Sequence, residues 1–294
     1  MSSAAPTVVT ERIPKFIADK ARLLTEVGID RAKGEIELAL CYLLNCKRLD
    51  LYLHGYDILT DDARSRLDGI IQRRIKREPL QYILGESWFY GRRFRVTPAA
   101  MVPTPETELL CEKAIRYVQR CDMKKPHLLD IGVGSGVIAV TMALEVPECS
   151  IVALDISPDA LNVARSNAAE LGAMNRIGFI ESDFFAAIAP HERFDLILSN
   201  PPYIADGEYD ELPPEVKADP PVALLAGEDG LNAIRTILRD APKFLAPGGR
   251  IIFEIGYDQG ERVTRLTESD QRYRSITFIK DYNDYDRIVM LSCD

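Results

Sequence analysis

The chain has 294 residues, of which 47% are hydrophobic and 28% are charged, and its net charge is −9 at pH 7. This composition is typical of a globular protein and excludes an intrinsically disordered chain. The acidic balance argues against a protein that grips nucleic-acid phosphates unless its positive charge is clustered. No apolar run reaches the roughly 18–20 residues that cross a bilayer, and Met1–Pro6 does not begin a signal peptide, so we expect a cytoplasmic protein with no membrane partner.

The cysteines and histidines give no sign of a metal site. The six cysteines include no C-x-x-C pair. None of the three histidines (His54, His127 and His191) stands at metal-ligand spacing from another. Zinc and redox sites need such close pairs, so we expect reduced thiols and no bound metal.

The first part of the sequence has the apolar spacing of helices. Asp30 is expected to cap one helix. Thr60 is expected to open a second, which the Glu78–Pro79 pair stops. We therefore predict an all-helical N-terminal domain over residues 1–80, and small helical units of this kind commonly dock a partner.

The next segment, residues 81–104, changes character. Its aromatic and β-branched residues, together with Gly85 and Gly91, favour short strands and a hairpin that links two domains. Thr104 then reads as a helix N-cap, with Pro105 at the first helical position. The second domain is predicted to span residues 105–294.

Strand and helix patterns alternate after Lys125. The predicted strands cover residues 127–130, 150–154, 177–181, 194–198, 250–254, 275–280 and 287–291, and the last two follow each other with only a turn between them. This order predicts an α/β fold with a seven-stranded, mostly parallel sheet, one antiparallel strand and helices on both faces.

A glycine-rich loop follows the first predicted strand. The strand ends at Asp130, and the loop consists of Gly132, Val133, Gly134, Ser135 and Gly136. Glycines allow a sharp turn close to a ligand, and the following helix offers free N–H groups. A dinucleotide site needs G-x-G-x-x-G, whereas this loop is G-x-G-x-G. The spacing resembles the first motif of class I S-adenosylmethionine-dependent methyltransferases.

The next two strand ends carry the residues that this resemblance implies. Asp155 ends the second strand, where a carboxylate accepts hydrogen bonds from both ribose hydroxyls of the cofactor. Asp183 and Phe184 follow the third strand, where they are expected to bind and stack on the adenine. The alternative roles are a helix cap for Asp155 and core packing for Phe184.

The fourth strand ends in the tetrapeptide Asn200-Pro201-Pro202-Tyr203. At the carboxyl edge of the sheet it would face the methyl group of the cofactor. The Asn200 side-chain carbonyl and the Pro201 main-chain carbonyl are two acceptors for a planar NH₂ group, and proline adds no competing donor. Tyr203 is expected to stack on that group. We therefore predict that Asn200, Pro201 and Tyr203 are catalytic and that all four residues bind the substrate. Asn200 is also expected to contact the cofactor, together with Asp130 and residues 132–136.

Motifs over almost the whole chain resemble the release factor glutamine methyltransferase family. The matching segments are residues 78–85, 103–108, 212–216, 227–231, 247–249, 254–256 and 286–287. The resemblance implies methyl transfer from S-adenosyl-L-methionine to N5 of the glutamine in the Gly-Gly-Gln loop of peptide chain release factors, with S-adenosyl-L-homocysteine as the other product. One departure is Thr104, where the family usually has arginine.

Local charge favours a protein substrate over a nucleic acid. The acidic residues after the tetrapeptide are Asp206, Glu208, Asp210, Glu211, Glu215 and Asp219, against the single cation Lys217. They would repel a phosphate backbone, so no direct nucleic-acid contact is expected. Basic clusters at residues 73–77 and 92–95 are either solvated faces or docking surfaces. The alternatives are methyl transfer to a base amine of DNA or RNA and a non-catalytic scaffold. We expect a monomer.

Overall fold

The computed structural model describes residues 13–53 and 59–293. Met1–Pro6 and His54, considered above, lie outside the described residues. The chain divides into two compact units, Met1–Leu84 and Gly85–Asp294. Each unit has a hydrophobic core of its own.

The first unit is helical, as predicted. Its helices are α1 (Ile13–Thr25), α2 (Ala32–Leu44), α3 (Asp50–Leu53), α4 (Asp61–Ile75) and α5 (Leu80–Leu84). Thr60 caps α4 by accepting a hydrogen bond from the Ala63 N–H at 3.2 Å, which confirms its predicted role. The prediction for Asp30 is wrong. Arg31 occupies the N-cap of α2, so Asp30 stands one residue too early to reach the free N–H groups of the first turn.

The second unit contains a seven-stranded sheet in the order β5-β4-β3-β6-β7-β9-β8. Its strands are β3 (His127–Ile131), β4 (Ser150–Asp155), β5 (Ile177–Glu181), β6 (Phe194–Ser199), β7 (Leu245–Glu254), β8 (Tyr273–Lys280) and β9 (Asp286–Cys293). Strands β3 to β7 are parallel, and β9 is antiparallel to both β7 and β8. The predicted mostly parallel sheet with one antiparallel strand is confirmed.

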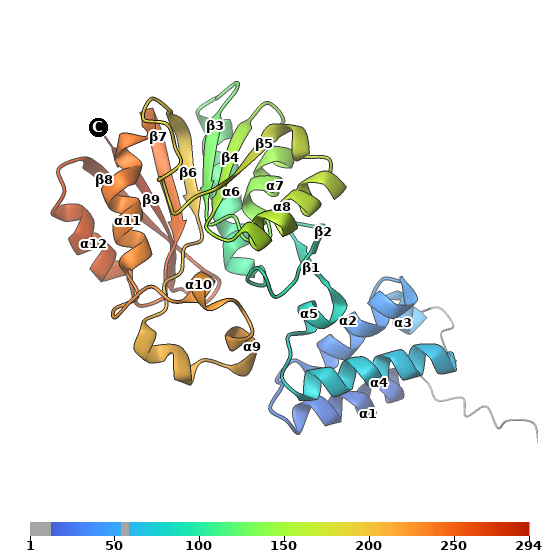
Figure 1. Ribbon diagram of the computed structural model, residues 1–294. Helices are drawn as coiled ribbons and strands as arrows, with labels where there is room; N and C mark the ends of the chain where they lie inside the picture. The colour runs from blue at the N-terminus through green and yellow to red at the C-terminus, as the bar shows by residue number, and fades with distance from the viewer. Residues whose placement is uncertain (1–12, 54–58, 294) are drawn as a thin grey trace, which may run out of the picture. The chain divides into compact units, whose positions relative to one another are not determined.

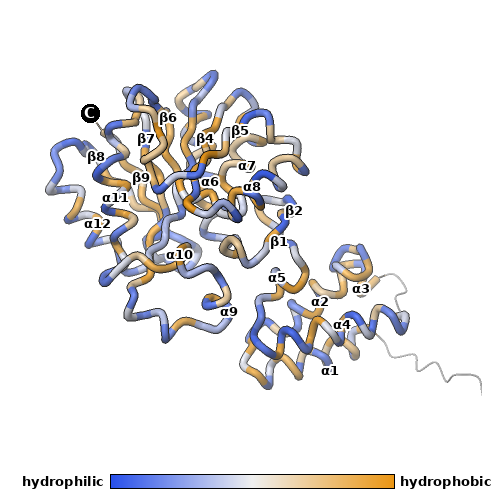
Figure 2. The backbone as a smooth tube through the Cα atoms, viewed as in Figure 1, coloured by the Kyte–Doolittle hydropathy of each residue, from blue (hydrophilic) through white to orange (hydrophobic). Residues whose placement is uncertain are grey.

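Helices cover both faces of this sheet (Figure 1). Successive strand residues point to opposite faces, so Leu128 packs into one core cluster and Leu129 into the other. The first cluster includes α6 (Pro105–Arg120), α7 (Val137–Glu145) and α8 (Pro158–Glu170), and the second includes α11 (Asn232–Asp240) and α12 (Gly260–Glu268). Figure 2 shows the central strands as mainly hydrophobic, which explains why they are buried on both sides.

The predicted hairpin is formed by β1 (Glu86–Phe89) and β2 (Arg92–Arg95). The rings of Phe89 and Phe94 meet edge to face at 6.0 Å and belong to the core of the second unit. Asn167 on α8 fastens the hairpin, because its side chain accepts from the Arg95 N–H and donates to the Arg95 carbonyl. The hairpin is therefore a built part of the sheet-containing unit.

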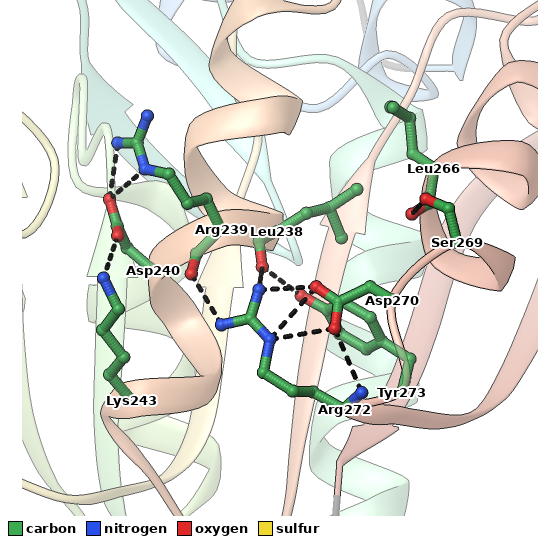
Figure 3. A network of polar contacts seen from close by, with 9 residues as sticks. All are labelled: Leu238, Arg239, Asp240, Lys243, Leu266, Ser269, Asp270, Arg272 and Tyr273. Atoms are coloured by element: carbon green, nitrogen blue, oxygen red, sulfur yellow. Dashed lines mark hydrogen bonds and ion pairs between the residues drawn. The ribbon is translucent and has the colours of Figure 1, made fainter.

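A polar network joins the end of α11 to the start of β8 at the surface (Figure 3). Arg272 pairs with Asp270 at 2.5 Å and donates to the carbonyl of Arg239 at 2.9 Å. The Tyr273 hydroxyl donates to the carbonyl of Leu238 at 2.5 Å. These donors satisfy carbonyl groups that the end of a helix leaves without intrahelical partners.

Within residues 13–53 and 59–293, the search for a helix both long and apolar enough to span a membrane finds none.

Candidate active site

Four neighbouring parallel strands, β3 to β6, end at one edge of the sheet. The loops that follow them surround a cavity of about 360 Å³, which is within the range of roughly 300–1,000 Å³ for small-molecule sites. The predicted site residues that line this cavity are Gly132, Val133, Gly134, Ser135, Asp155, Asp183, Phe184, Asn200, Pro201 and Pro202. The predicted site residues outside the lining are Asp130, Gly136 and Tyr203.

The glycine-rich loop after β3 approaches α8 closely. Gly136 has φ +87°, and a Cβ atom there would lie 3.1 Å from Ala164 on α8. Only glycine combines this backbone conformation with such a close approach. The Asn167 amide donates to the Ser135 carbonyl at 2.8 Å. The loop is thus held between the sheet and α8, which explains why Gly136 shapes the cavity without lining it.

Asp155, at the end of β4, is fixed by two backbone hydrogen bonds. Its Oδ2 accepts from the Gly134 N–H and its Oδ1 from the Ser157 N–H, both at 2.9 Å. Burial raises the pKa of the carboxyl, and these two bonds oppose the shift. Each carboxylate oxygen keeps a lone pair for a ligand in the cavity. The capping alternative is not needed, because Ser157 itself caps α8 through the Ala160 N–H.

Asp130 lies behind the lining and is fully buried. Its Oδ2 accepts from the Ala139 N–H at 3.0 Å, while its Oδ1 has no hydrogen-bond partner in the described part of the chain. Burial raises the pKa of this carboxyl to about 7. An unsatisfied buried acceptor is costly, and this one lies near the carboxyl end of β3, behind the residues that line the cavity.

Asp183 and Phe184, after β5, both line the cavity. Phe184 has φ 47°, which is uncommon for a residue other than glycine. Ser182 supports this conformation, because its hydroxyl donates to the Phe184 carbonyl at 2.7 Å and accepts from the Ala187 N–H. Phe184 also packs against the second core cluster, as its alternative role expects, and stacking on the adenine stays a prediction.

The Asn200–Tyr203 turn after β6 is held from several sides. The Asn200 side-chain NH₂ donates to the Thr107 hydroxyl at 3.0 Å. The Tyr203 hydroxyl donates to Glu254 at 3.3 Å, and the Tyr203 carbonyl accepts from the Gln259 side chain at 2.9 Å. The turn therefore brings Asn200, Pro201 and Pro202 to the cavity, while Tyr203 is outside the lining and its hydroxyl is bonded to Glu254.

Sequence reasoning missed Thr107, Glu254 and Gln259. Thr107 and Glu254 lie in segments that match the family motifs, and that match was the only signal available. Gln259 is 1% exposed and donates to the carbonyls of both Tyr203 and Gly230. These residues are far apart in the chain, so only the folded structure brings them to the turn.

Similar sequences identify the family of this chain. Residues 17–85 match the PrmC N-terminal domain, and residues 110–212 match the Methyltransferase small domain. The release factor glutamine methyltransferase of Cereibacter sphaeroides is 43% identical over 269 residues, which is 90% of this chain and 93% of that protein. That of Neisseria gonorrhoeae is 39% identical over 259 residues, or 88% and 92%.

The chain belongs to the release factor glutamine methyltransferase family.

Among solved structures, the hMettl16 catalytic domain in complex with MAT2A 3′UTR hairpin 1 has a TM-score of 0.56 at 15% identity and covers 79% of this chain and 81% of that chain. This likeness shows the fold alone. In the part of this family member that the structure describes, the search for groups of three or more His, Cys, Asp or Glu side chains able to hold a metal ion finds none.

Residues of two further segments, 99–103 and 220–227, also line the family member's cavity, and the second segment contains the short helix α10 (Pro221–Leu224). Asp219 is buried and ties them together by accepting from the Val102 N–H at 3.2 Å. Asp219 is therefore not one of the exposed acidic residues that follow the tetrapeptide. The exposed acidic residues of this segment are Asp206, Glu208, Asp210 and Glu211.

Most arginines of the basic clusters have partners within the chain. Arg74 is buried and pairs with Glu35 at 2.6 Å. Arg73 pairs with Glu78, and Arg92 pairs with Glu145. These side chains contribute to structure, which weakens their interpretation as a free docking surface for a release factor.

Proposed function

We propose that this protein transfers a methyl group from S-adenosyl-L-methionine to the side-chain amide nitrogen (N5) of the glutamine in the Gly-Gly-Gln loop of peptide chain release factors. The family membership over about nine-tenths of the chain supports this substrate. The observation that carries the proposal is the Asn200–Pro202 turn, which lines the same cavity as the glycine-rich loop and Asp155. A planar amide and a methyl donor would meet there.

The residues present fit the proposed methyl donor. Asp155 offers two oriented carboxylate oxygens for the ribose hydroxyls. Asp183 and Phe184 line the same cavity, where they would accept from the adenine amino group and stack on its ring. The unpartnered Oδ1 of Asp130 is available to a donor group of the ligand. When bound, S-adenosyl-L-methionine supplies an electrophilic sulfonium methyl group, and no metal is required.

Asn200 and Pro201 address the weak nucleophilicity of an amide nitrogen. The nitrogen lone pair is delocalised into the carbonyl, so the NH₂ group must be held with that lone pair toward the methyl donor. The Asn200 Oδ1 and the Pro201 carbonyl accept hydrogen bonds from the two N–H groups of the substrate amide. They also stabilise the positive charge that develops on its nitrogen. One N–H proton is then lost to water, and S-adenosyl-L-homocysteine is the other product. Stacking by Tyr203 stays a prediction, because its hydroxyl is directed to Glu254.

The remaining assignments follow from the same proposal. The helical N-terminal unit docks the release factor, and the sheet-containing unit, which includes the hairpin, performs the transfer. The enzyme acts as a monomer in the cytoplasm, where translation terminates. The exposed acidic residues after the tetrapeptide would repel a phosphate backbone. They therefore support a protein substrate over the alternative, a base amine of DNA or RNA.

The proposal is tested by incubating the enzyme and labelled S-adenosyl-L-methionine with a bacterial release factor. We expect label in the peptide that contains Gly-Gly-Gln, and no label when that glutamine is replaced. Duplex DNA and ribosomal RNA serve as parallel acceptors. Label in either nucleic acid, with none in release factors, would overturn the substrate assignment.

A further inference from the structure

A buried chain of hydrogen bonds runs behind the Asn200 side chain. The Asn200 NH₂ group donates to Thr107 Oγ1 at 3.0 Å, and the Thr107 hydroxyl donates to Glu254 Oε2 at 2.9 Å. The other carboxylate oxygen, Oε1, accepts from the Tyr203 hydroxyl at 3.3 Å. Thr107 is 2% exposed and Glu254 is 1% exposed, so water does not compete for these bonds.

The chemistry of these groups sets the direction of each bond. A carboxylate only accepts, whereas a hydroxyl has a single proton to donate. Because Thr107 gives its proton to Glu254, its oxygen must accept from Asn200. The Asn200 carboxamide therefore turns its NH₂ group to Thr107 and keeps its carbonyl oxygen for the cavity. The carbonyl oxygen and the NH₂ group of a carboxamide have nearly the same shape. Without this chain of hydrogen bonds, packing alone would not decide which of the two faces the cavity.

Thr104 adds a fifth member to the chain. Its hydroxyl lies 3.3 Å from Thr107 Oγ1. Since the only proton of Thr107 is used on Glu254, Thr104 is the donor of this contact. Thr107 then accepts two bonds and donates one, which satisfies its full capacity. Thr104, which stands where the family usually has arginine, thus donates to the Thr107 hydroxyl in this protein.

We propose that Thr107 and Glu254 are positioning residues that orient the Asn200 carboxamide, with its carbonyl oxygen toward the substrate amide. The inference rests on the proposed function, in which Asn200 accepts from the glutamine NH₂ group. A turned carboxamide would present its own NH₂ group to the substrate NH₂ group, and two donors would face each other. Thr107 and Glu254 act through Asn200 in this scheme and do not touch the reacting atoms.

The protonation state of Glu254 controls the chain. The charged and titratable groups that face it are Arg287 on β9, Glu106 and Cys111 on α6, and Tyr203. Burial raises the pKa of Glu254 to about 7, while Thr107 and Arg287 act in the opposite direction. A protonated Glu254 can donate to Thr107, and the proton of Thr107 is then free to point to Thr104 or to Asn200. Acid therefore removes the constraint that fixes the orientation of the Asn200 carboxamide.

Steady-state kinetics with a release factor separate positioning from folding. Thr107→Val keeps the shape of the side chain and removes its hydroxyl, and we expect kcat to fall by roughly 10- to 100-fold through misplacement of Asn200, with KM for S-adenosyl-L-methionine unchanged. Thr107→Ser should restore most of kcat. The matched control is Thr141→Val, since Thr141 is a buried threonine on α7 whose hydroxyl has no partner in the described part of the chain. It should behave as wild type. Equal kcat in Thr107→Val and wild type would overturn the proposal.

The pH profile tests Glu254. In the wild type kcat should decrease as the pH falls through about 7. In Glu254→Gln that decrease should disappear, because glutamine does not titrate. An acid limb that persists unchanged in Glu254→Gln would contradict the role of this carboxylate.

A spectroscopic measurement does not depend on the substrate. In protein labelled with ¹⁵N-asparagine, the side-chain NH₂ signal of Asn200 is assigned by its loss in Asn200→Asp. We expect one proton of this pair to lie downfield in the wild type and to move upfield in Thr107→Val but not in Thr141→Val. An Asn200 signal that does not move would overturn the hydrogen-bond chain even if release factors are methylated. If release factors are not methylated, the shift still reports on the chain, and only the proposed function fails.

Discussion

Two polar networks of this protein differ in burial and in what they hold. Figure 3 shows the network of Arg272, Asp270 and Tyr273. It is partly exposed to solvent, since the Arg272 side chain is 43% exposed. The network of Asn200, Thr107 and Glu254 begins at the cavity wall, and its Thr107 and Glu254 side chains are almost fully buried. The surface network contains ion pairs that solvent screens, and it joins a helix end to a strand. The buried network has a single carboxylate at its end, so each of its hydrogen bonds has a defined direction.

The comparison teaches where a precise orientation can be set. A surface side chain that loses its partner binds water at little cost, whereas a buried one leaves an unsatisfied group. Changes in the buried network should therefore alter chemistry, and changes in the surface network should alter only stability, and only slightly.

The largest effect is expected at Asn200. Asn200→Ala removes the proposed acceptor of the substrate amide, and turnover should fall by roughly 10²- to 10³-fold or more, as for other groups that stabilise developing charge. Cofactor binding should remain largely intact, which calorimetry with S-adenosyl-L-methionine measures. Unchanged turnover would remove Asn200 from its catalytic role.

The backbone under the turn should be nearly as sensitive. Gly230 has φ +72°, and a Cβ atom there would lie 2.5 Å from the Tyr203 carbonyl oxygen. Gly230→Ala should cost about 1–3 kcal/mol of unfolding free energy from the strained backbone alone, and it should also lower turnover. Gly207→Ala is the matched control, because its Cβ would meet nothing within 4 Å. Denaturant unfolding of both variants measures the difference, and equal losses would refute the close contact.

Asp155→Ala should weaken cofactor binding. Loss of hydrogen bonds to a charged acceptor costs about 1.5–3 kcal/mol, which corresponds to roughly a 10- to 150-fold rise in Kd. Calorimetry with S-adenosyl-L-methionine measures it. An unaltered Kd would exclude Asp155 from the ribose site.

Asp130 should make the stability of the protein depend on pH. The pKa of its carboxyl is raised in the folded state from 3.8 to about 7, so the folded protein binds this proton more tightly than the unfolded chain does. The stability that this proton confers is complete below about pH 4 and is lost as the pH rises through about 7. Asp130→Asn should lack this loss. The Tm of Asp130→Asn minus the Tm of the wild type should therefore be a few degrees larger at pH 8 than at pH 5. Thermal melts at the two pH values measure this difference. The same Tm difference at both pH values would contradict the assignment.

The smallest effect is expected in the surface network. Arg272→Ala removes an ion pair and two carbonyl contacts at a partly exposed site, and it should lower the unfolding free energy by about 1 kcal/mol or less. Turnover and cofactor affinity should not change. A large loss of activity in this variant would show that the two networks are coupled.

Much of the fold was predictable because its signals are local. The apolar strands from β3 to β9 and the glycine-rich loop depend on residues close together in the chain, and all appear at the expected places. Asp30 was misassigned because capping depends on the exact first residue of the helix, which the apolar spacing leaves open by one position. Residues 81–84 were expected in strands and turns, whereas α5 includes them, because five residues are too few for a clear period.

The sequence by itself determined the order of strands and helices, the family, and which residues end the strands β3 to β6. Those features follow from the periodicity of apolar residues and from short motifs. Only the tertiary structure decided that the hydroxyl of Tyr203 is directed to Glu254, that Asp219 ties two loops together, and that Thr107 connects Asn200 to a buried carboxylate. Hydrogen bonds between residues about 50 to 150 positions apart in the chain leave no periodic trace in the sequence, because they depend on how helices and strands pack and not on their local composition.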